Sequence, residues 1–320
     1  MTPLAVLIGE EIREHGPIGF DRFMDLALYH PEFGYYRRKH HDPFGKRGDF
    51  YTASQLQPVF GRLIARAVST LRAEIGEPEN FRVVELGPGR GEMAEALREF
   101  RYHPVEIGSA LPEKITGVVF SNEFFDALPV RVVERQADRW HERLVTMSQD
   151  RFTFVAGPAV NEATFNSNQT IAELHDASFL WIKRIARHLE RGFVLTIDYG
   201  YTTRETLRFP QGTLMSYHAH TASDDVLSAP GERDITSHVP FDALREAGEA
   251  AGLETVRFET LSQFILRLGE SDHFQELVRG GGELALKTLL YGMGESFRVL
   301  LQRKSQDLHQ KKTAPIARGR

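Results

Sequence analysis

The stretch that decides the fold is residues 81–91, which read FRVVELGPGRG. Four of its first six residues are apolar, and two of these are β-branched valines, which is typical of a short buried strand. Three glycines follow at once, and the apolar residues Met93, Leu97 and Phe100 then indicate a helix. A strand, a glycine turn and a helix form the opening unit of a doubly wound parallel sheet. The sequence therefore predicts an α/β fold with a Rossmann-like sheet.

The glycine turn also points to a ligand. Glycines at a strand-to-helix turn let a ligand approach backbone that a Cβ would block. A nicotinamide dinucleotide needs a further glycine at position 92, but Glu92 stands there, and its carboxylate would repel a pyrophosphate. S-adenosylmethionine has no phosphate, and Glu85 can meet the positive amino group of its methionine part. The predicted cofactor-binding residues of this turn are Glu85, Gly87, Pro88, Gly89 and Gly91. The alternative is a turn that only packs helix on strand.

A second acidic residue lies at the spacing of a ribose-binding acid. Glu106 follows Gly87 by 19 residues (106 − 87), close to the ~20 at which such an acid holds ribose hydroxyls. Only 16 positions (122 − 106) then separate Glu106 from Asn122. A crossover between parallel strands alone takes ~10–12 residues. Either one strand unit is therefore missing from the sheet, or Glu106 is not the ribose acid.

A polar segment follows the apolar strand predicted at residues 118–121 and provides the candidate catalytic residues. Asn122 offers an amide carbonyl, and Glu123 and Asp126 offer carboxylates, with Phe124 and Phe125 as apolar walls between them. Two acids beside a methyl donor suit a cationic acceptor, and carboxylates hold a guanidinium bidentately. The alternative is a helix start, with Asn122 as its cap and the acids favoured by the helix dipole.

The remaining pattern gives the domain organisation. Residues 130–155 alternate apolar with charged side chains, which predicts an antiparallel meander. Helices are expected behind Pro58 and at residues 240–252, 261–268 and 284–303. We predict a helical N-terminal region with one loop at residues 1–77 and a Rossmann-like core at 78–260. The β insertion lies at about 130–157, C-terminal helices at 261–305 and a flexible tail at 306–320.

Composition excludes several classes of protein. Apolar residues make up 41% and charged residues 26% of the 320 residues, and 39 basic against 44 acidic residues give a net charge of −5. This balance argues against nucleic acid as a partner. The chain has no cysteine, and the spacing of His218, His220 and His238 matches no metal site, so no metal is expected. No membrane insertion and no signal or transit peptide are expected, which predicts a cytoplasmic protein.

With these motifs in place, the chain resembles the MidA-like family of S-adenosylmethionine-dependent methyltransferases. The resemblance runs through GDFYT at residues 48–52, NEFFDALP at 122–129, DYGY at 198–201 and DITSHV at 234–239. It implies a methyltransferase core, a helical N-terminal region over the donor site and an inserted β-element. It also implies that Asp49, Tyr51 and Thr52 belong to a loop that covers the donor.

The family includes a mitochondrial assembly factor that methylates an arginine of a respiratory complex I subunit. The resemblance therefore implies an arginine of a protein as the acceptor and a respiratory-complex subunit as a candidate partner. Two alternatives remain open. One is a small-molecule O- or N-methyltransferase. The other is a partner-binding assembly factor with a vestigial donor site, which the short interval after Glu106 motivates.

Overall fold

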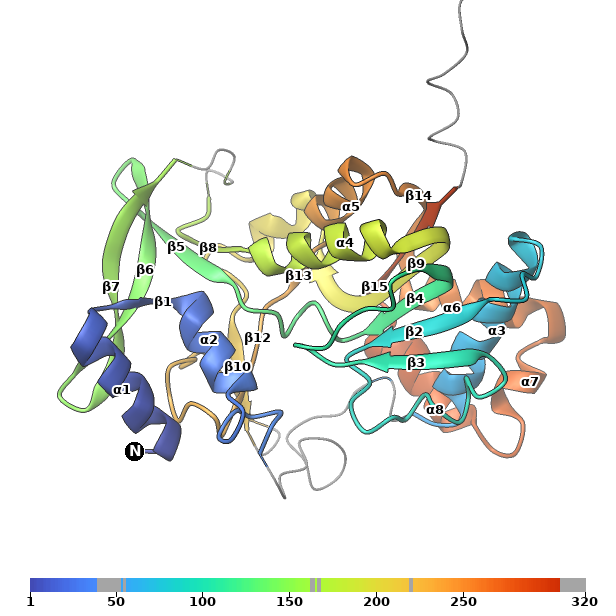
Figure 1. Cartoon of the computed structure of the whole chain (residues 1–320), viewed down its shortest axis with the longest axis horizontal. Coiled ribbons are helices and arrows are strands. Elements are labelled where there is room, and N and C mark those ends of the chain that lie inside the picture. The colour runs from blue at the N-terminus through green and yellow to red at the C-terminus, as the bar shows by residue number, and fades with distance from the viewer. Residues whose placement is uncertain (39–52, 54–55, 162–164, 166–167, 219–220, 306–320) are drawn as a thin grey trace, which may run out of the picture. The chain divides into compact units, whose positions relative to one another are not determined.

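The computed structural model describes residues 1–38, 53, 56–161, 165, 168–218 and 221–305 (Figure 1). The chain forms two compact units that alternate along the sequence. The first comprises Met1–Leu56, Glu123–Trp181 and Asp198–Leu244, and the second comprises Gln57–Asn122, Ile182–Ile197 and Arg245–Arg320. The predicted division into a cap, a core, C-terminal helices and a tail stays a prediction.

The second unit is built on a twisted sheet with the strand order β14-β15-β9-β4-β2-β3. The strands β2, β3, β4 and β9 run parallel to one another, and β14 pairs antiparallel with β15. The strands are β2 (Arg82–Leu86), β3 (Arg101–Val105), β4 (Ile115–Asn122), β9 (Leu189–Tyr201), β14 (Glu254–Thr260) and β15 (Phe297–Lys304). The predicted Rossmann-like sheet is thus confirmed.

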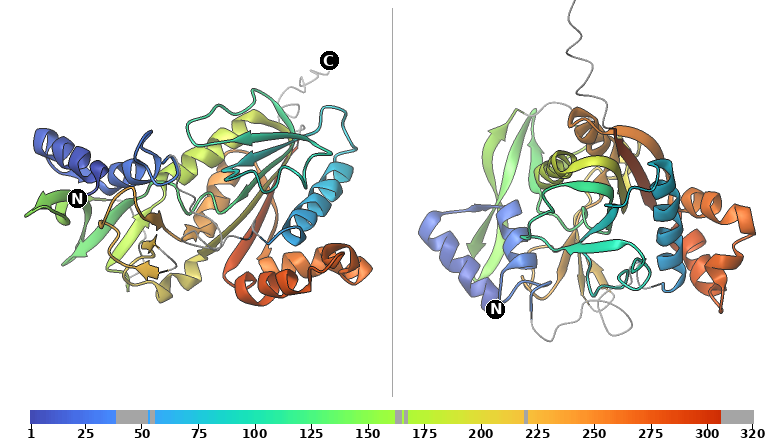
Figure 2. Two further views of the ribbon diagram at one scale, coloured as in Figure 1. Left: turned by 90° about the horizontal axis from the view of Figure 1, so that it is seen from below. Right: turned by 45° about the vertical axis from the view of Figure 1, so that its right-hand side comes forward.

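Helices cover both faces of this sheet (Figure 2). The amphipathic helix α3 (Val59–Glu74) lies on one face, and its apolar residues, from Phe60 to Leu71, are buried as predicted. The C-terminal halves of α4 (Asp176–His188) and α5 (Phe241–Ala250) lie on the other face. Central strands covered on both faces must be apolar throughout, which is why β4 and β9 are buried along most of their length.

The strand β3 is the sheet edge in the described part of the chain. Residues 106–114 connect it directly to β4 without a helix or a strand. The short interval between Glu106 and Asn122 therefore reflects a strand unit that is missing from the sheet, the first of the two explanations given above. Glu106 nevertheless directly follows β3, so the loss of that unit does not remove it from the carboxyl end of the sheet.

The helix expected around Met93, Leu97 and Phe100 is wrong, and the helix predicted at residues 284–303 is correct only in its first half. Residues 88–100 form successive turns, in which most hydrogen bonds span three residues, such as Ala94 N–H to Gly91 O at 3.0 Å. Gly89 and Gly91 have positive φ angles of 57° and 79°, which a right-handed helix cannot include. Residues 284–303 form α8 (Glu283–Lys287), a π-helical turn η4 (Thr288–Met293) and then β15. The apolar run of β15 fits a buried strand as well as a helix face, and pairing with β14 decides between them.

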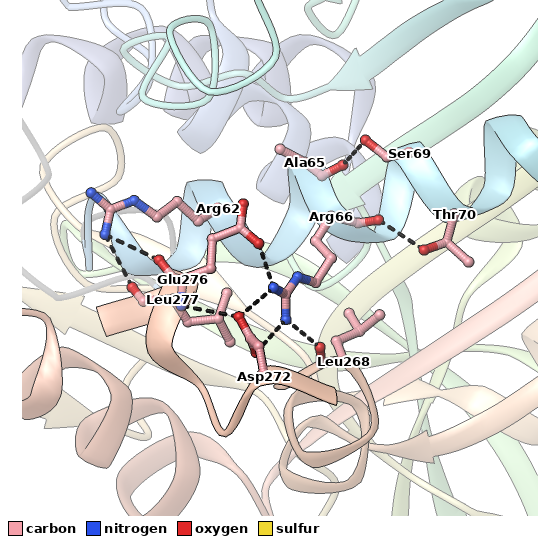
Figure 3. Close-up of polar contacts among 9 residues, drawn as sticks. All are labelled: Arg62, Ala65, Arg66, Ser69, Thr70, Leu268, Asp272, Glu276 and Leu277. Carbon is pink, nitrogen blue, oxygen red and sulfur yellow. Dashed lines mark hydrogen bonds and ion pairs between the residues drawn. The ribbon is translucent and has the colours of Figure 1, made fainter. Parts of the chain in front are cut away.

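An ion-pair cluster ties α3 to the C-terminal helices of the second unit (Figure 3). Arg66 donates to both carboxylate oxygens of Asp272, at 3.0 and 2.7 Å, and it also pairs with Glu276. Hydrogen bonding to this guanidinium lowers the pKa of Asp272 to about 2. The cluster joins α3 to a 3-10 turn, η3 (Glu270–Asp272), and to α7 (Gln275–Val278), next to α6 (Leu261–Gly269).

The first unit combines helices with two antiparallel sheets. The helices α1 (Pro3–His15) and α2 (Phe20–Tyr29) pack against the larger sheet (Figure 1). That sheet contains β1 (Ile18–Gly19), β5 (Arg131–Gln136), β6 (Arg139–Ser148), β7 (Arg151–Val160) and β8 (Ile171–Leu174). The hairpins β5–β6 and β6–β7 confirm the predicted meander.

The smaller sheet of the first unit contains β10 (Met215–His218), β11 (Thr221–Ser223) and β12 (Asp234–Thr236). A 3-10 turn, η2 (Thr203–Arg208), follows β9, and β13 (Val239–Pro240) pairs in parallel with the end of β9 before α5 begins. The helix predicted at residues 240–252 is thus confirmed as α5. Among the residues that the structure describes, no helix is long and apolar enough to cross a membrane.

Candidate functional site

The glycine turn follows β2 at the carboxyl end of the sheet in the second unit. Gly87, Gly89 and Gly91 all have positive φ angles, of 63°, 57° and 79°. A Cβ built on Gly91 meets no heavy atom within 4 Å, so the space beside this backbone is open. Residues with side chains rarely adopt this conformation, which explains why glycine recurs here. The turn thus presents accessible backbone where ligands bind in this fold.

Glu85 lies in β2 just before this turn, and its side chain is buried. Its carboxylate accepts a hydrogen bond from the Tyr102 hydroxyl of β3, and no lysine or arginine of the described residues pairs with it. Burial raises the pKa of Glu85 to about 7, against the lowering effect of the Tyr102 hydrogen bond, and Glu92 and Glu106 raise it further. A cation beside Glu85 would favour its ionised form. The site therefore fits the ammonium group of the methionine part of S-adenosylmethionine.

Glu106 and Glu92 flank the same end of the sheet. Val105 is the register partner of Leu86, so Glu106 leaves β3 where the glycine turn leaves β2. Glu106 is exposed. Glu92 accepts a hydrogen bond from the Arg90 N–H at 3.1 Å, within the turn itself. The structure thus brings Glu85, the glycines and Glu106 to the carboxyl ends of the neighbouring strands β2 and β3.

The segment that begins at Asn122 takes an irregular path. Asn122 ends β4, and residues 123–130 form turns, so the helix-start alternative for this segment is wrong. The backbone is instead held by Asp198, the first residue of the last segment of the first unit. Asp198 Oδ2 accepts from the Phe124 N–H at 3.2 Å and the Phe125 N–H at 2.9 Å. The Asp198 carboxylate thus accepts from two backbone N–H groups that a helix cap would otherwise satisfy.

Asp126 is a buried carboxylate, 5% exposed, in the middle of this segment. One of its oxygens accepts from the Tyr199 hydroxyl at 2.5 Å. The other, Oδ1, has no hydrogen-bond partner among the described residues. Burial raises the pKa of Asp126 to about 6, although the Tyr199 hydrogen bond lowers it. Burial, together with Asp126 and Glu123, also raises the pKa of Asp198.

Glu123 has a different environment, because it is half-buried and has a positive φ of 51°. Its Oε1 accepts a hydrogen bond from the Ala53 N–H at 2.9 Å. A residue with a side chain in this conformation is strained, and such strain often marks a functional position. Ala53 directly follows the GDFYT string. The predicted donor-loop residues Asp49, Tyr51 and Thr52 themselves lie outside the described residues.

The two phenylalanines do not form walls of an open site. Phe124 and Phe125 are 3% and 0% exposed. Their rings meet edge to face at 5.4 Å, and Phe124 contacts Trp181 in the same way at 5.1 Å. The sequence interpretation was wrong because apolar residues next to acids can pack inward while the backbone turns between them. Through Phe124 they hold the acidic segment against Trp181 of α4.

Sequence reasoning missed two tyrosine–aspartate pairs. Tyr199 donates to Asp126, and Tyr36 donates to Asp234 Oδ1 at 2.8 Å. The only signal for Tyr199 was its place beside the strand-end acid in DYGY. Among the histidines considered for metal, His218 contacts the Glu232 carbonyl at 3.1 Å, and His220 lies outside the described residues. The described residues contain no cluster able to hold a metal ion.

The chain is similar in sequence and in structure to known proteins. Residues 104–259 match the family described as "Putative S-adenosyl-L-methionine-dependent methyltransferase". The crystal structure of a COG1565 superfamily member from Burkholderia thailandensis, bound to S-adenosyl-homocysteine, is 30% identical with a TM-score of 0.82. The match covers 94% of this chain and 92% of that one. The chain belongs to the MidA-like methyltransferase family.

Curated relatives of this methyltransferase carry a more specific name. Protein arginine methyltransferase NDUFAF7, mitochondrial, from Xenopus tropicalis is 27% identical, over 88% of this chain and 79% of the relative. The rat protein of the same name is also 27% identical, over 97% of this chain and 86% of the relative. The predicted activity, an S-adenosylmethionine-dependent methyltransferase, and its cofactor are thereby confirmed. The individual site residues stay predictions.

Proposed function

We propose that this methyltransferase transfers a methyl group to an arginine side chain of a protein. The observation that carries the proposal is the pair of buried carboxylates, Asp126 and Asp198, for which no described residue supplies a lysine or arginine partner. A buried anion without a counter-charge is costly. A guanidinium from an acceptor would supply that charge and form charge-assisted hydrogen bonds. The name of the curated relatives supports the same acceptor.

For the donor, the proposed contacts are the residues at the carboxyl end of the sheet. Glu85 would pair with the ammonium group, the turn formed by Gly87, Pro88, Gly89 and Gly91 would receive the methionine part, and Glu106 would hold the ribose hydroxyls. When bound, S-adenosylmethionine supplies an electrophilic methyl group on a sulfonium. We assign Asp49, Tyr51 and Thr52 to a covering loop, supported by the hydrogen bond that the N–H of the adjacent Ala53 donates to Glu123.

For the acceptor, we assign Asn122, Glu123 and Asp126 to binding and catalysis. A free guanidinium has a pKa above ~12, so its nitrogen must lose a proton as it is methylated. Burial raises the pKa of Asp126 above that of an ordinary carboxyl group, which makes it a stronger base, and we assign it as the general base that takes up that proton. Glu123 and Asn122 would orient the planar group by hydrogen bonding. Positioning of this kind provides much of the rate enhancement in a displacement reaction.

The proposed partner is a protein, and the family resemblance favours a subunit of a respiratory complex. We place the activity in the bacterial cytoplasm. A chain without cysteine, and hence without a disulfide framework, is consistent with this location.

The test is mass spectrometry of a lysate incubated with the purified protein and an isotopically labelled methyl donor. We expect labelled arginine in a protein. Label on small molecules alone would favour the small-molecule alternative. Calorimetric titration with S-adenosylmethionine tests the assembly-factor alternative, which predicts no binding.

Gly89→Val supplies the inactive control for both measurements. A branched side chain would fill the space that the ligand must approach, so we expect no donor binding and no label. Gly76→Val is the matched variant, because Gly76 has a φ of 73° in a turn after α3, away from the glycine turn. Both variants introduce similar backbone strain, and only Gly89→Val should lose the donor. Equal donor affinity in the two variants would contradict the assignment of the turn.

A further inference from the structure

The Tyr199 hydroxyl is fixed from several sides within the first unit. Its backbone N–H donates to Asp198 Oδ1 at 3.0 Å, and the next residue, Gly200, pairs with Val239 of β13. Its ring meets the His238 ring edge to face at 5.3 Å and 85°. These contacts of strand, backbone and ring place the hydroxyl 2.5 Å from Asp126 Oδ2, to which it donates. A second hydrogen bond joins Tyr199 to the Thr236 side chain of β12.

The charges around Asp126 show what this hydrogen bond does. Asp198 and the tyrosines Tyr36, Tyr199 and Tyr217 lie close enough to Asp126 for it to raise their pKa values. The charge of Asp234 raises the pKa of Tyr36 and of Tyr217, and the charge of Glu123 raises the pKa of Asp198. All these groups are neutral or negative. Backbone N–H groups of Asp126 and Ala127 lower the pKa of Asp126, and Tyr199 is the one side chain in the described structure that also does so by a hydrogen bond, with the larger effect.

The two oxygens of Asp126 consequently differ. Tyr199 holds one, while Oδ1 is buried and accepts nothing from the described residues. A carboxylate held at one oxygen cannot rotate freely, so its second oxygen has a defined direction. This asymmetry suits a group that must meet a planar cation at one face.

We propose that Tyr199 is a positioning residue of the methyltransferase, whose hydroxyl fixes one oxygen of Asp126 and thereby presents the other to the cationic acceptor. The inference rests on the proposed function, in which Asp126 contacts the acceptor guanidinium. Tyr199 itself touches neither donor nor acceptor in this scheme. It acts through Asp126 alone, and Thr236 supports it by polarising its hydroxyl.

The test measures the pH dependence of kcat for Tyr199→Phe, with labelled donor and the arginine-containing protein acceptor. The ring and its packing remain, while the hydrogen bond to Asp126 is lost. We expect kcat to fall about 10- to 100-fold. The acidic limb of the pH profile should move to higher pH, because a bond that favoured the ionised carboxylate is gone. Donor affinity should stay within a factor of two of the parent.

Two further variants keep the test decisive. Tyr201→Phe removes a buried tyrosine hydroxyl from the same strand without touching Asp126, and its pH profile should match the parent. Thr236→Val should move the acidic limb in the same direction as Tyr199→Phe but by less, and it answers the question if Tyr199→Phe fails to fold. An unmoved limb in a folded Tyr199→Phe, or an equal movement in Tyr201→Phe, would overturn the inference.

Asp126→Asn separates this inference from the proposed function. If Asp126→Asn is inactive while Tyr199→Phe behaves as the parent, the positioning role is wrong and the proposed role of Asp126 stands. If Asp126→Asn retains full activity, both are wrong.

Discussion

Carboxylates are held in opposite ways in two regions of this methyltransferase. In the second unit, Asp272 and Glu276 share the guanidinium of Arg66, and the pKa of Asp272 falls to about 2 (Figure 3). In the first unit, Asp126 and Asp198 are buried more deeply, and the partners that the described residues give them are backbone N–H groups and a tyrosine. There, burial raises the pKa of both carboxyl groups.

Under the proposed function, the difference separates carboxylates that serve the fold from carboxylates that meet a ligand. The Arg66 cluster is complete, because each acid has its cation and the planar fork meets Asp272 bidentately. No described residue supplies a cation to Asp126 and Asp198, and in the proposed function the arginine acceptor would supply it. Glu85 repeats this arrangement in the second unit, with Tyr102 as its donor and no cation among the described residues. We therefore expect the two kinds of site to respond oppositely to mutation.

The largest effect is expected at the acidic segment. Asp126→Asn should reduce methylation by ~10²-fold or more, since an amide can hydrogen-bond but cannot take up a proton. Glu123→Gln should act in the same direction. Donor affinity should stay nearly intact in both variants, and the free energy of unfolding should not fall for Asp126→Asn, because a costly buried charge is removed. Steady-state turnover, calorimetry and thermal unfolding on the same samples measure all three.

Asp138→Asn, in the turn between β5 and β6, is the matched control, because it makes the same chemical change at an exposed residue. It should leave turnover unchanged. Full turnover in Asp126→Asn, with a lowered melting temperature, would mean that this carboxylate serves the fold just as Asp272 does.

The next effect concerns Glu106, the acid at the sheet edge left by the missing strand unit. Glu106→Ala should weaken donor binding by ~1.5–3 kcal/mol if its carboxylate holds ribose hydroxyls. The residue is exposed, so the fold should tolerate the change. Calorimetric titration measures the affinity, with Glu113→Ala on the connection between β3 and β4 as an exposed control. An affinity within a factor of two of the parent would place the ribose acid elsewhere.

The complementary variant, Arg66→Ala, should affect stability instead of activity. Removing the guanidinium leaves two acids facing each other and also removes the bond to the Leu268 carbonyl. Because the pairs are partly exposed, we expect a loss of about 1–2 kcal/mol in the free energy of unfolding. Donor affinity and turnover should remain at parental values. Chemical denaturation measures the loss, and a drop in turnover without a drop in stability would contradict the structural role of this cluster.

The parts of this molecule that sequence predicted are those with a local signature. The glycine turn, the meander and the amphipathic helix α3 depend on residue type and period within a few positions. The strand β15 was missed because its pairing with β14 decided it, and the turns at residues 88–100 were missed because their apolar spacing also fits a helix.

The candidate site divides in the same way. Glu85 and Glu106 follow from their spacing to the glycines. The bond from Tyr199 to Asp126 joins residues 73 positions apart, and that from Tyr36 to Asp234 joins residues 198 positions apart. No pattern along the chain specifies which hydroxyl meets which carboxylate, so only the folded structure reveals these pairs.

The smallest effect concerns the pH dependence of donor binding through Glu85. Its pKa of about 7 in the free protein, raised from 4.5 chiefly by burial, means that much of the protein carries a protonated Glu85 at neutral pH. Pairing with the donor ammonium requires the ionised form, so this proton must leave on binding. Affinity should therefore fall as pH drops below 7, approaching tenfold per pH unit. It should also weaken above about pH 8, where an α-amino group loses its own proton. Calorimetry from pH 5.5 to 9 in two buffers of different ionisation enthalpy measures both the affinity and the proton release.

The same proton affects the stability of the protein without donor. Between about pH 4.5 and about pH 7 the folded protein keeps Glu85 protonated, while the unfolded chain has lost this proton. Glu85 should therefore make the free energy of unfolding decline as pH rises through this range. Glu85→Gln should remove both dependences on the acidic side, and an affinity of the parent that stays constant between pH 6 and 8 would show that Glu85 does not face the donor cation.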